Sequence, residues 1–230
     1  MSLVKYGGGV VQMSGSIAGT CFARNSSGNY ARARTKPVNP SSALQVARRT
    51  TLAYWTEYWH ETLSAANRTG WATYANYVAM KNRLGESIKL SGFNHFVRVN
   101  VFRKTIGQSA CPNAPTILSL PDKDPSFAIA ASAGTQLITV TFDDTLPWGD
   151  IVASAMGIFM GRPQLLTRNF FKGPYQYAGS IPGNGVSPLT VAAPMLLVLG
   201  QRLWCYARIA TGPTDSRLSE KFSDDCIVTA

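Results

Sequence analysis

The spacing of apolar residues changes near residue 110, and this change limits what the chain can fold into. Before that point, large apolar residues recur every three or four positions, which is the period of an amphipathic helix. Beyond it, they alternate in short runs separated by Gly, Pro, Asp and Asn, which is typical of strands. We therefore expect an α+β protein in three parts: an arm over residues 1–40, a helical domain over 41–110 and a β-rich domain over 111–230.

The first 40 residues are rich in Gly and Ser and predict an extended arm that ends in a β-hairpin. Turn-forming residues at 25–29 lie between two strand-like runs, 20–24 and 30–36. The arm has too few apolar residues to offset the entropy lost on ordering, so we expect other chains to order it. Alternate side chains of the second run share one face, which holds Tyr30, Arg32, Arg34 and Lys36.

Three helices are predicted between residues 39 and 101. Asn39 and Pro40 favour a helix start, and Ser64 and Ser91 are suitable N-caps for the second and third helices. Each helix has an apolar stripe with aromatic residues, so we expect a small bundle with an aromatic core. The stripes are Leu44, Ala47, Thr51, Trp55, Tyr58, Trp59 and Leu63; Trp71, Tyr74, Ala75 and Val78; and Phe93, Phe96, Val97 and Val101.

Strands with the spacing of a β-sandwich are predicted after residue 110, at 116–120, 137–142, 152–160, 175–180, 203–209 and 225–229. Alternation assigns to the core Ile138, Val140, Phe142, Met156, Ile158, Met160, Leu203, Cys205, Ala207 and Ile209. The opposite face of the fifth strand holds Trp204, Tyr206 and Arg208, which we expect to be exposed and to form a subunit interface. The alternative is that the loop over 169–185 folds across them.

Four segments of the β-rich domain are similar to strands A, B and F and the F–G turn of a fibronectin type III domain. They are Pro115-Thr116-Ile117, Leu137–Phe142, Leu197–Ile209 and Arg217-Leu218-Ser219. Two positions depart from that family: Phe142 stands where it usually has Trp, and Leu203 or Trp204 stands near its usual corner Tyr. The resemblance implies a fibronectin type III-like β-sandwich.

A second resemblance rests on Asn39-Pro40-Ser41-Ser42, Gln45, Arg48, Trp59, Leu63, Trp71 and Leu90-Ser91-Gly92-Phe93-Asn94. In these residues the helical domain resembles uncharacterised proteins encoded by tailed bacteriophages and related prophages. The resemblance implies a structural role in a virion.

Charge is divided unevenly along the chain, whose formal net charge is +10. Residues 1–110 hold fourteen Lys and Arg against three Glu, whereas residues 111–230 hold eight against nine Asp and Glu. A basic half favours a polyanion or an acidic protein surface as partner, and basic residues beside an aromatic ring suit nucleic acid. We favour a protein partner, with DNA proximity second. The expected contact residues are Arg24, Tyr30, Arg32, Arg34, Lys36, Arg48 and Arg49.

The sequence has no convincing catalytic or metal-binding constellation. His60 and His95 lie in helical patterns, and the pair Asp143-Asp144 lacks further ligands at calcium-loop spacing. The four cysteines lack the spacing of a zinc site and predict buried thiols. No apolar run is long enough to cross a bilayer, and we expect no signal peptide. We therefore expect no enzyme, no cofactor, no membrane partner and no small-molecule substrate.

These observations together predict a structural component of a bacteriophage virion, in the capsid, neck or tail. We expect it to act through contacts with its own copies and with other virion proteins, near packaged DNA, after synthesis in the host cytoplasm. Two alternatives stay open. One is a nucleic-acid-binding protein that uses the basic half, and the other is a surface adhesion or carbohydrate-binding module.

Overall fold

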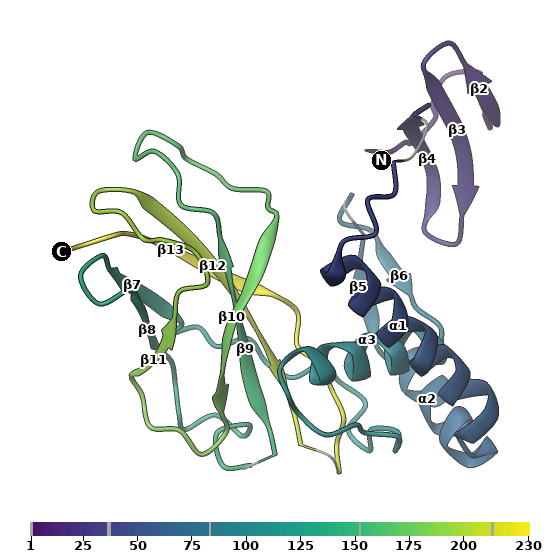
Figure 1. The fold of residues 1–230 in the computed structure, drawn as a ribbon. Coiled ribbons are helices and arrows are strands. Elements are labelled where there is room, and N and C mark those ends of the chain that lie inside the picture. The colour runs from purple at the N-terminus through teal and green to yellow at the C-terminus, as the bar shows by residue number, and fades with distance from the viewer. Residues whose placement is uncertain (1, 36–37, 83, 152, 213) are drawn as a thin grey trace.

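The computed structural model describes residues 2–35, 38–82, 84–151, 153–212 and 214–230. Within them it is a mixed α and β structure: a small N-terminal sheet, a group of helices with a short hairpin, and two larger antiparallel sheets follow one another along the chain. The N-terminal sheet stands apart from the two larger sheets, and the helices lie between them (Figure 1).

The N-terminal sheet is built around the predicted hairpin. Asn25 pairs with Gly28, which leaves a two-residue turn of Ser26 and Ser27, and the Asn25 side chain accepts a hydrogen bond from the Ser27 amide at 2.9 Å. Gly28 has a φ of +114°, which disfavours any residue with a side chain. The strands are β1 Ser2–Leu3, β2 Gly15–Ile17, β3 Thr20–Asn25 and β4 Gly28–Ala33, in the antiparallel order β1-β4-β3-β2.

This sheet has no core. Every side chain of residues 2–35 is exposed or only partly buried, so the prediction that the arm lacks a core of its own is confirmed. Lys5 ties the sheet to the rest of the chain, because its Nζ lies 2.5 Å from Glu86 Oε1. That ion pair is solvent-exposed and contributes about 0–1 kcal/mol.

The helices are α1 Ala43–Glu57, the π-helical segment η1 Tyr58–Thr62, α2 Ala65–Tyr77 and α3 Gly92–Thr105; strands β5 Ala79–Lys81 and β6 Ser87–Lys89 form a hairpin between α2 and α3. The hydroxyls of Ser64 and Ser91 accept the amides of Asn67 and Asn94, both at 3.2 Å, so both predicted N-caps are confirmed.

The predicted start of the first helix is wrong. The Asn39 side chain accepts a hydrogen bond from Arg49 Nη2 at 2.7 Å instead of capping the helix. Ser41 has a φ of +47°, and the extended backbone of Ser42 precedes the first helical residue, Ala43. The chain therefore enters α1 three residues later than the Asn39-Pro40 pair indicates.

Aromatic rings hold the helices together. Phe96 of α3 is fully buried, and its ring centroid lies 5.3 to 6.2 Å from those of Trp55, Tyr58, Trp59 and Trp71. The predicted stripe of α2 is buried, whereas the α1 stripe is only partly right. Its first members are exposed, since all of residues 43–50 lie beyond the packed part of the bundle.

The two larger sheets pack face to face around the main core. One has the order β10-β9-β12-β13 and the other β11-β8-β7. The ten core residues predicted by alternation are all buried, and they meet between the sheets. The strands are β7 Ala128–Ser132, β8 Leu137–Thr141, β9 Ala155–Gly161, β10 Tyr175–Pro182, β11 Leu189–Ala192, β12 Arg202–Ala210 and β13 Phe222–Ile227.

The strand predicted at 116–120 does not form. This segment lies between Pro115 and Pro121, and the Ser119 carbonyl accepts a hydrogen bond from the Arg217 side chain rather than from a neighbouring strand. The edge strand of this sheet that precedes β8 in the chain is β7, whose Ile129 and Ala131 face the core. Its Ala-rich sequence hides the alternation.

The helices and the sheets also share a second core. Phe102 of α3 and Ile106, the residue that follows α3, belong to the same buried cluster as Ala155 and Phe159 of β9 and Leu218. The helical part is thus docked on the outer face of the β10-β9-β12-β13 sheet. Of the cysteines, Cys111 and Cys205 are buried as predicted, whereas Cys21 and Cys226 are partly exposed.

Candidate functional site

The predicted basic strip of the arm is present on one face of the N-terminal sheet. Tyr30 and Arg32 alternate along β4, and the ladder continues to Arg34, whose amide donates to the Gly19 carbonyl at 2.8 Å. Both arginines are exposed and Tyr30 is half-buried. The structure therefore brings these three residues together, while the predicted fourth member, Lys36, lies outside the described residues. We call Tyr30, Arg32 and Arg34 the basic strip.

Arg24 does not belong to the basic strip. Arg32 lies opposite Cys21, whereas Arg24 lies opposite Asn29. Because side chains alternate between the two faces of a sheet, Arg24 points away from the face that holds Arg32. Arg24 therefore lies outside the basic strip, and its predicted contact with a partner stays a prediction that concerns the opposite face of the sheet.

The Cys21 thiol lies beside the basic strip, opposite Arg32, and its pKa is affected by the charge of the strip. Cys21 is half-buried on the strip face, next to Ser16 of β2. A hydrogen bond with the Ser16 side chain and then one with Arg32 lower the pKa of the Cys21 thiol, and the charges of Arg32 and Arg34 lower it further. The strip thus stabilises negative charge placed on this face.

Arg48 and Arg49 make contacts of a different kind. Arg48 Nη1 hydrogen-bonds to Thr105 Oγ1 of α3, and Arg49 binds Asn39. Within the described part of the chain, these contacts tie α1 to the last turn of α3 and to the segment before α1. Among the described residues, the hydrogen bonds of Arg48 and Arg49 do not involve the basic strip.

The outer face of β12 is covered within the chain. Trp204 is only 8% exposed, and its ring stacks on Phe171 with centroids 5.9 Å apart and 18° between planes. Tyr206 stacks on Phe159 and meets the edge of Tyr175. Alternation assigned these side chains to the correct face, but the prediction that this face is exposed is wrong. Phe171 and Tyr175 belong to the segment 169–185, so the alternative prediction, in which this segment folds across the face, is confirmed for Trp204 and Tyr206.

Arg208, the third residue of that face, lies beside α3. Arg98 of α3 donates to the carbonyls of Leu218 and Ser219 at 3.3 and 3.1 Å. Burial, and then the neighbouring charge of Arg208, lower the pKa of Arg98 to about 10. Burial also lowers the pKa of Arg208. Trp204, Tyr206 and Arg208 are therefore packed within the chain, and the prediction that they are exposed for a subunit contact is wrong.

A buried arginine that sequence reasoning missed fixes α3 to the β-domain. Arg103 is fully buried, and its guanidinium donates to the carbonyls of Ser109 at 2.7 Å, Thr211 at 2.5 Å and Ala153 at 3.4 Å. Burial lowers its pKa. Its position in the sequence could have indicated this burial, because a residue seven positions after Phe96 lies on the same, apolar side of α3.

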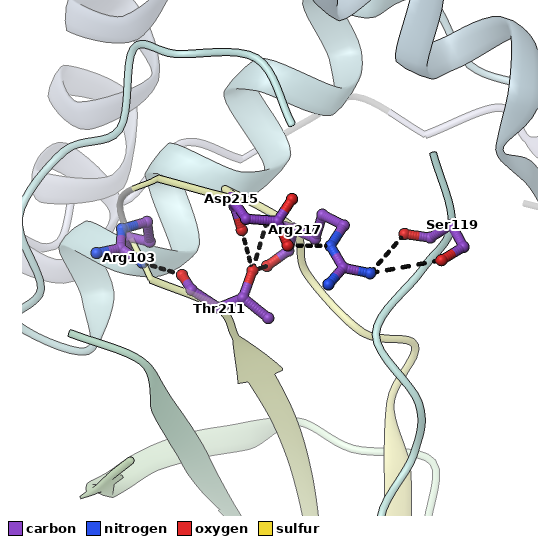
Figure 2. A network of polar contacts seen from close by, with 5 residues as sticks. All are labelled: Arg103, Ser119, Thr211, Asp215 and Arg217. Carbon is purple, nitrogen blue, oxygen red and sulfur yellow. Dashed lines mark hydrogen bonds and ion pairs between the residues drawn. The ribbon is translucent and has the colours of Figure 1, made fainter. Parts of the chain in front are cut away.

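The network continues from Arg103 through the 211–217 loop (Figure 2). The Thr211 hydroxyl hydrogen-bonds to the Asp215 carbonyl, and Arg217 Nε lies 2.5 Å from Asp215 Oδ2. Arg217 Nη1 then donates to the Ser119 carbonyl at 3.1 Å. These hydrogen bonds and the ion pair connect α3, the residues Thr211, Asp215 and Arg217, and the segment that contains Ser119.

The histidines and carboxylates considered in the sequence do not gather into a metal site among the described residues. No group of three or more His, Cys, Asp or Glu among the described residues is placed to hold a metal ion. His60 is exposed, and His95 is fully buried with no hydrogen-bond partner for either ring nitrogen among the described residues. None of the described helices combines the length and the apolar character needed to span a bilayer.

No protein-family model matches the chain, and no curated protein matches it. The geometry offers a rigid helix-and-sheet body joined to a basic sheet without a core. Such an arrangement is suited to contacts with other macromolecules.

Proposed function

We propose that the chain is a non-enzymatic structural subunit of a bacteriophage virion, acting through contacts with other copies and other virion proteins. The observation that carries this proposal is the N-terminal sheet, whose four strands bury no side chain. Small sheets become stable by packing a face on another element. Residues 1–40 also contain five basic residues and no acidic one, so the sheet attracts an acidic neighbour.

The rest of the chain supports this proposal as a rigid platform. The partly buried Arg98 and the fully buried Arg103 fasten α3 to the β-domain through backbone carbonyls. The strand orders β11-β8-β7 and β10-β9-β12-β13 are compatible with a fibronectin type III-like sandwich, a fold that serves many functions. We propose that fold for residues 111–230, with β7 rather than 116–120 as its first strand.

Particle analysis tests the proposal. Phage particles released by the organism that carries the gene are purified and examined by quantitative mass spectrometry and electron cryomicroscopy. We expect the chain in a fixed copy number, with density for residues 2–35 against a neighbouring subunit. Its absence from intact particles, under conditions in which the chain is expressed, contradicts the proposal.

Nucleic-acid binding is a second candidate, and the basic strip favours it. Phosphate contacts release counterions, so each lost contact reduces the slope of log K against log salt by about 0.7–0.9. We expect Arg32→Ala with Arg34→Ala to reduce that slope if DNA is the partner. Arg24→Ala is the control, to be compared with each single substitution, because it removes one positive charge from the opposite face. Salt-insensitive assembly without DNA retention favours a protein partner.

A further inference from the structure

The two ends of the β-domain carry opposite charge. One end, here the basic end, consists of the loops over residues 162–174 and 193–201. The other, the acidic end, consists of the loops over 121–126, 143–151 and 183–187. Strand pairing places them at opposite ends of the sheets: Gly161 pairs with Tyr175 at the first, and Ala155 pairs with Pro182 at the second. The loop between β9 and β10 at the basic end extends away from the helices (Figure 1).

The basic end combines positive charge with exposed apolar side chains. Its two loops contain Arg162, Arg168 and Lys172 and no acidic residue. The Arg168 guanidinium lies over the ring of Phe170, 6.0 Å from its centroid, and Phe170 is 65% exposed. Other exposed apolar residues of these loops are Leu165, Leu166, Leu196, Val198 and Leu199. Exposed apolar side chains concentrated in two neighbouring loops favour an interaction site.

The conformation of the 162–174 loop is fixed by hydrogen bonds. Backbone hydrogen bonds join Gln164 and Arg202 in both directions at 2.9 Å, and Arg202 Nη1 donates to the Arg168 carbonyl at 3.2 Å. Arg202 in turn pairs with Asp225 at 2.6 Å. The loop is therefore presented in a defined shape, which reduces the entropy lost on binding.

The acidic end offers a complementary surface. Its loops contain the exposed Asp122 and Asp150, the partly buried Asp143 and Asp144 and the buried Asp124. Their single basic residue, Lys123, pairs with Glu220 at 2.8 Å. The Asp143 amide donates to Asp124 Oδ2 at 2.9 Å, which joins two of the loops. A groove of about 320 Å³ opens here, and its apolar wall includes Leu146, Trp148 and Ile151. Its charged lining residues are Asp122 and the pair Arg217–Asp215, whose charges offset each other at 2.5 Å.

We propose that the basic end of one copy docks on the acidic end of a second copy. Phe170 enters the apolar groove, and Arg168 and Lys172 face Asp122 and Asp150 at its rim. The contact rests on the proposed assembly function and names the partner as another copy of this chain. Because the two surfaces differ, the contact is head to tail and builds a ring or an open array rather than a two-fold dimer.

Charge reversal with exchange tests this contact in the full-length chain. The first variant is Arg168→Glu with Lys172→Glu, and the second is Asp122→Lys with Asp150→Lys; all four side chains are exposed, so the fold is expected to persist. Lys89→Glu with Lys104→Glu is the control, since it changes exposed charge outside both ends. Thermal unfolding of each variant verifies its fold, and sedimentation velocity at low salt measures association.

We expect the wild type and the control to associate and each reversed variant to lose about tenfold or more in affinity. An equimolar mixture of the two reversed variants restores association, because each altered end meets a partner of opposite charge. Phe170→Ser also weakens association. If the wild type associates but the reversed variants match it, or their mixture stays dissociated, the contact is wrong and the assembly function stands. A wild type that stays monomeric at all concentrations contradicts the contact and self-assembly together.

Discussion

The ring of Tyr206 lies flat on the ring of Phe159, with centroids 4.8 Å apart and 2° between the planes. Both side chains belong to the outer face of the β10-β9-β12-β13 sheet, where the helices dock. Phe159 also contacts Phe102 of α3, with centroids 5.9 Å apart. The stack therefore joins the sheet to the helical part and forms part of the internal packing of the chain.

Replacing Tyr206 will destabilise the monomer. Tyr206→Ala removes the stack on Phe159 and the edge contact with Tyr175, and we expect a loss of about 2–4 kcal/mol in the free energy of unfolding. Urea denaturation measures the change. Tyr77→Ala, at a residue 68% exposed on α2, is the control and should change stability by less than about 0.5 kcal/mol. Equal effects of the two substitutions contradict the assignment of Tyr206 to internal packing.

Removing the guanidinium of Arg103 will loosen α3 from the β-domain. Arg103→Met keeps an unbranched side chain but leaves three carbonyls without their donor, at a cost of about 2–3 kcal/mol. Lys104→Met changes the adjacent exposed residue and should be nearly neutral. Chemical denaturation followed by Trp fluorescence compares the two. An Arg103→Met protein as stable as the wild type would show that the network does not hold the parts together.

Buried His95 will make the fold sensitive to acid. Burial, and then the charge of Arg98, lower its pKa from 6.5 to about 4. Because the folded state disfavours the protonated ring, stability is complete above pH 6.5 and falls as the pH drops from 6.5 toward 4, by on the order of 2 kcal/mol. Tyr74, whose ring edge faces His95, does not titrate in this window, since burial raises its pKa to about 12.

The measurement is the free energy of unfolding between pH 7 and pH 4 for His95→Phe and for His60→Phe. We expect His95→Phe to remove part of the loss that the wild type shows, whereas His60→Phe, at an exposed position, retains it. Identical pH profiles for His95→Phe and the wild type contradict this role of His95.

Local signals in the sequence predicted local structure well. Ser64 and Ser91 cap their helices because a cap depends on residues within one turn. The ten residues that alternation assigned to the core are all buried between the sheets, although the core also holds residues it did not assign, such as Ile129, Ile181 and Val191. Contacts distant in sequence were not predictable in this way. Alternation shows which face holds Trp204, but not that Phe171 covers it. Likewise, nothing near Arg103 in the sequence names Thr211 as its partner.

In the proposed assembly, a neighbouring chain packs on the N-terminal sheet. The protection of the amides of residues 20–33 against hydrogen exchange tests this. Without a core, β3 and β4 open easily in the isolated chain, so their amides should exchange rapidly in a dilute sample that sedimentation shows to be monomeric. We expect their protection to rise on assembly, while that of β9 and β12 stays constant. Strong protection of β3 and β4 in the monomer, or none in the assembled state, contradicts the claim.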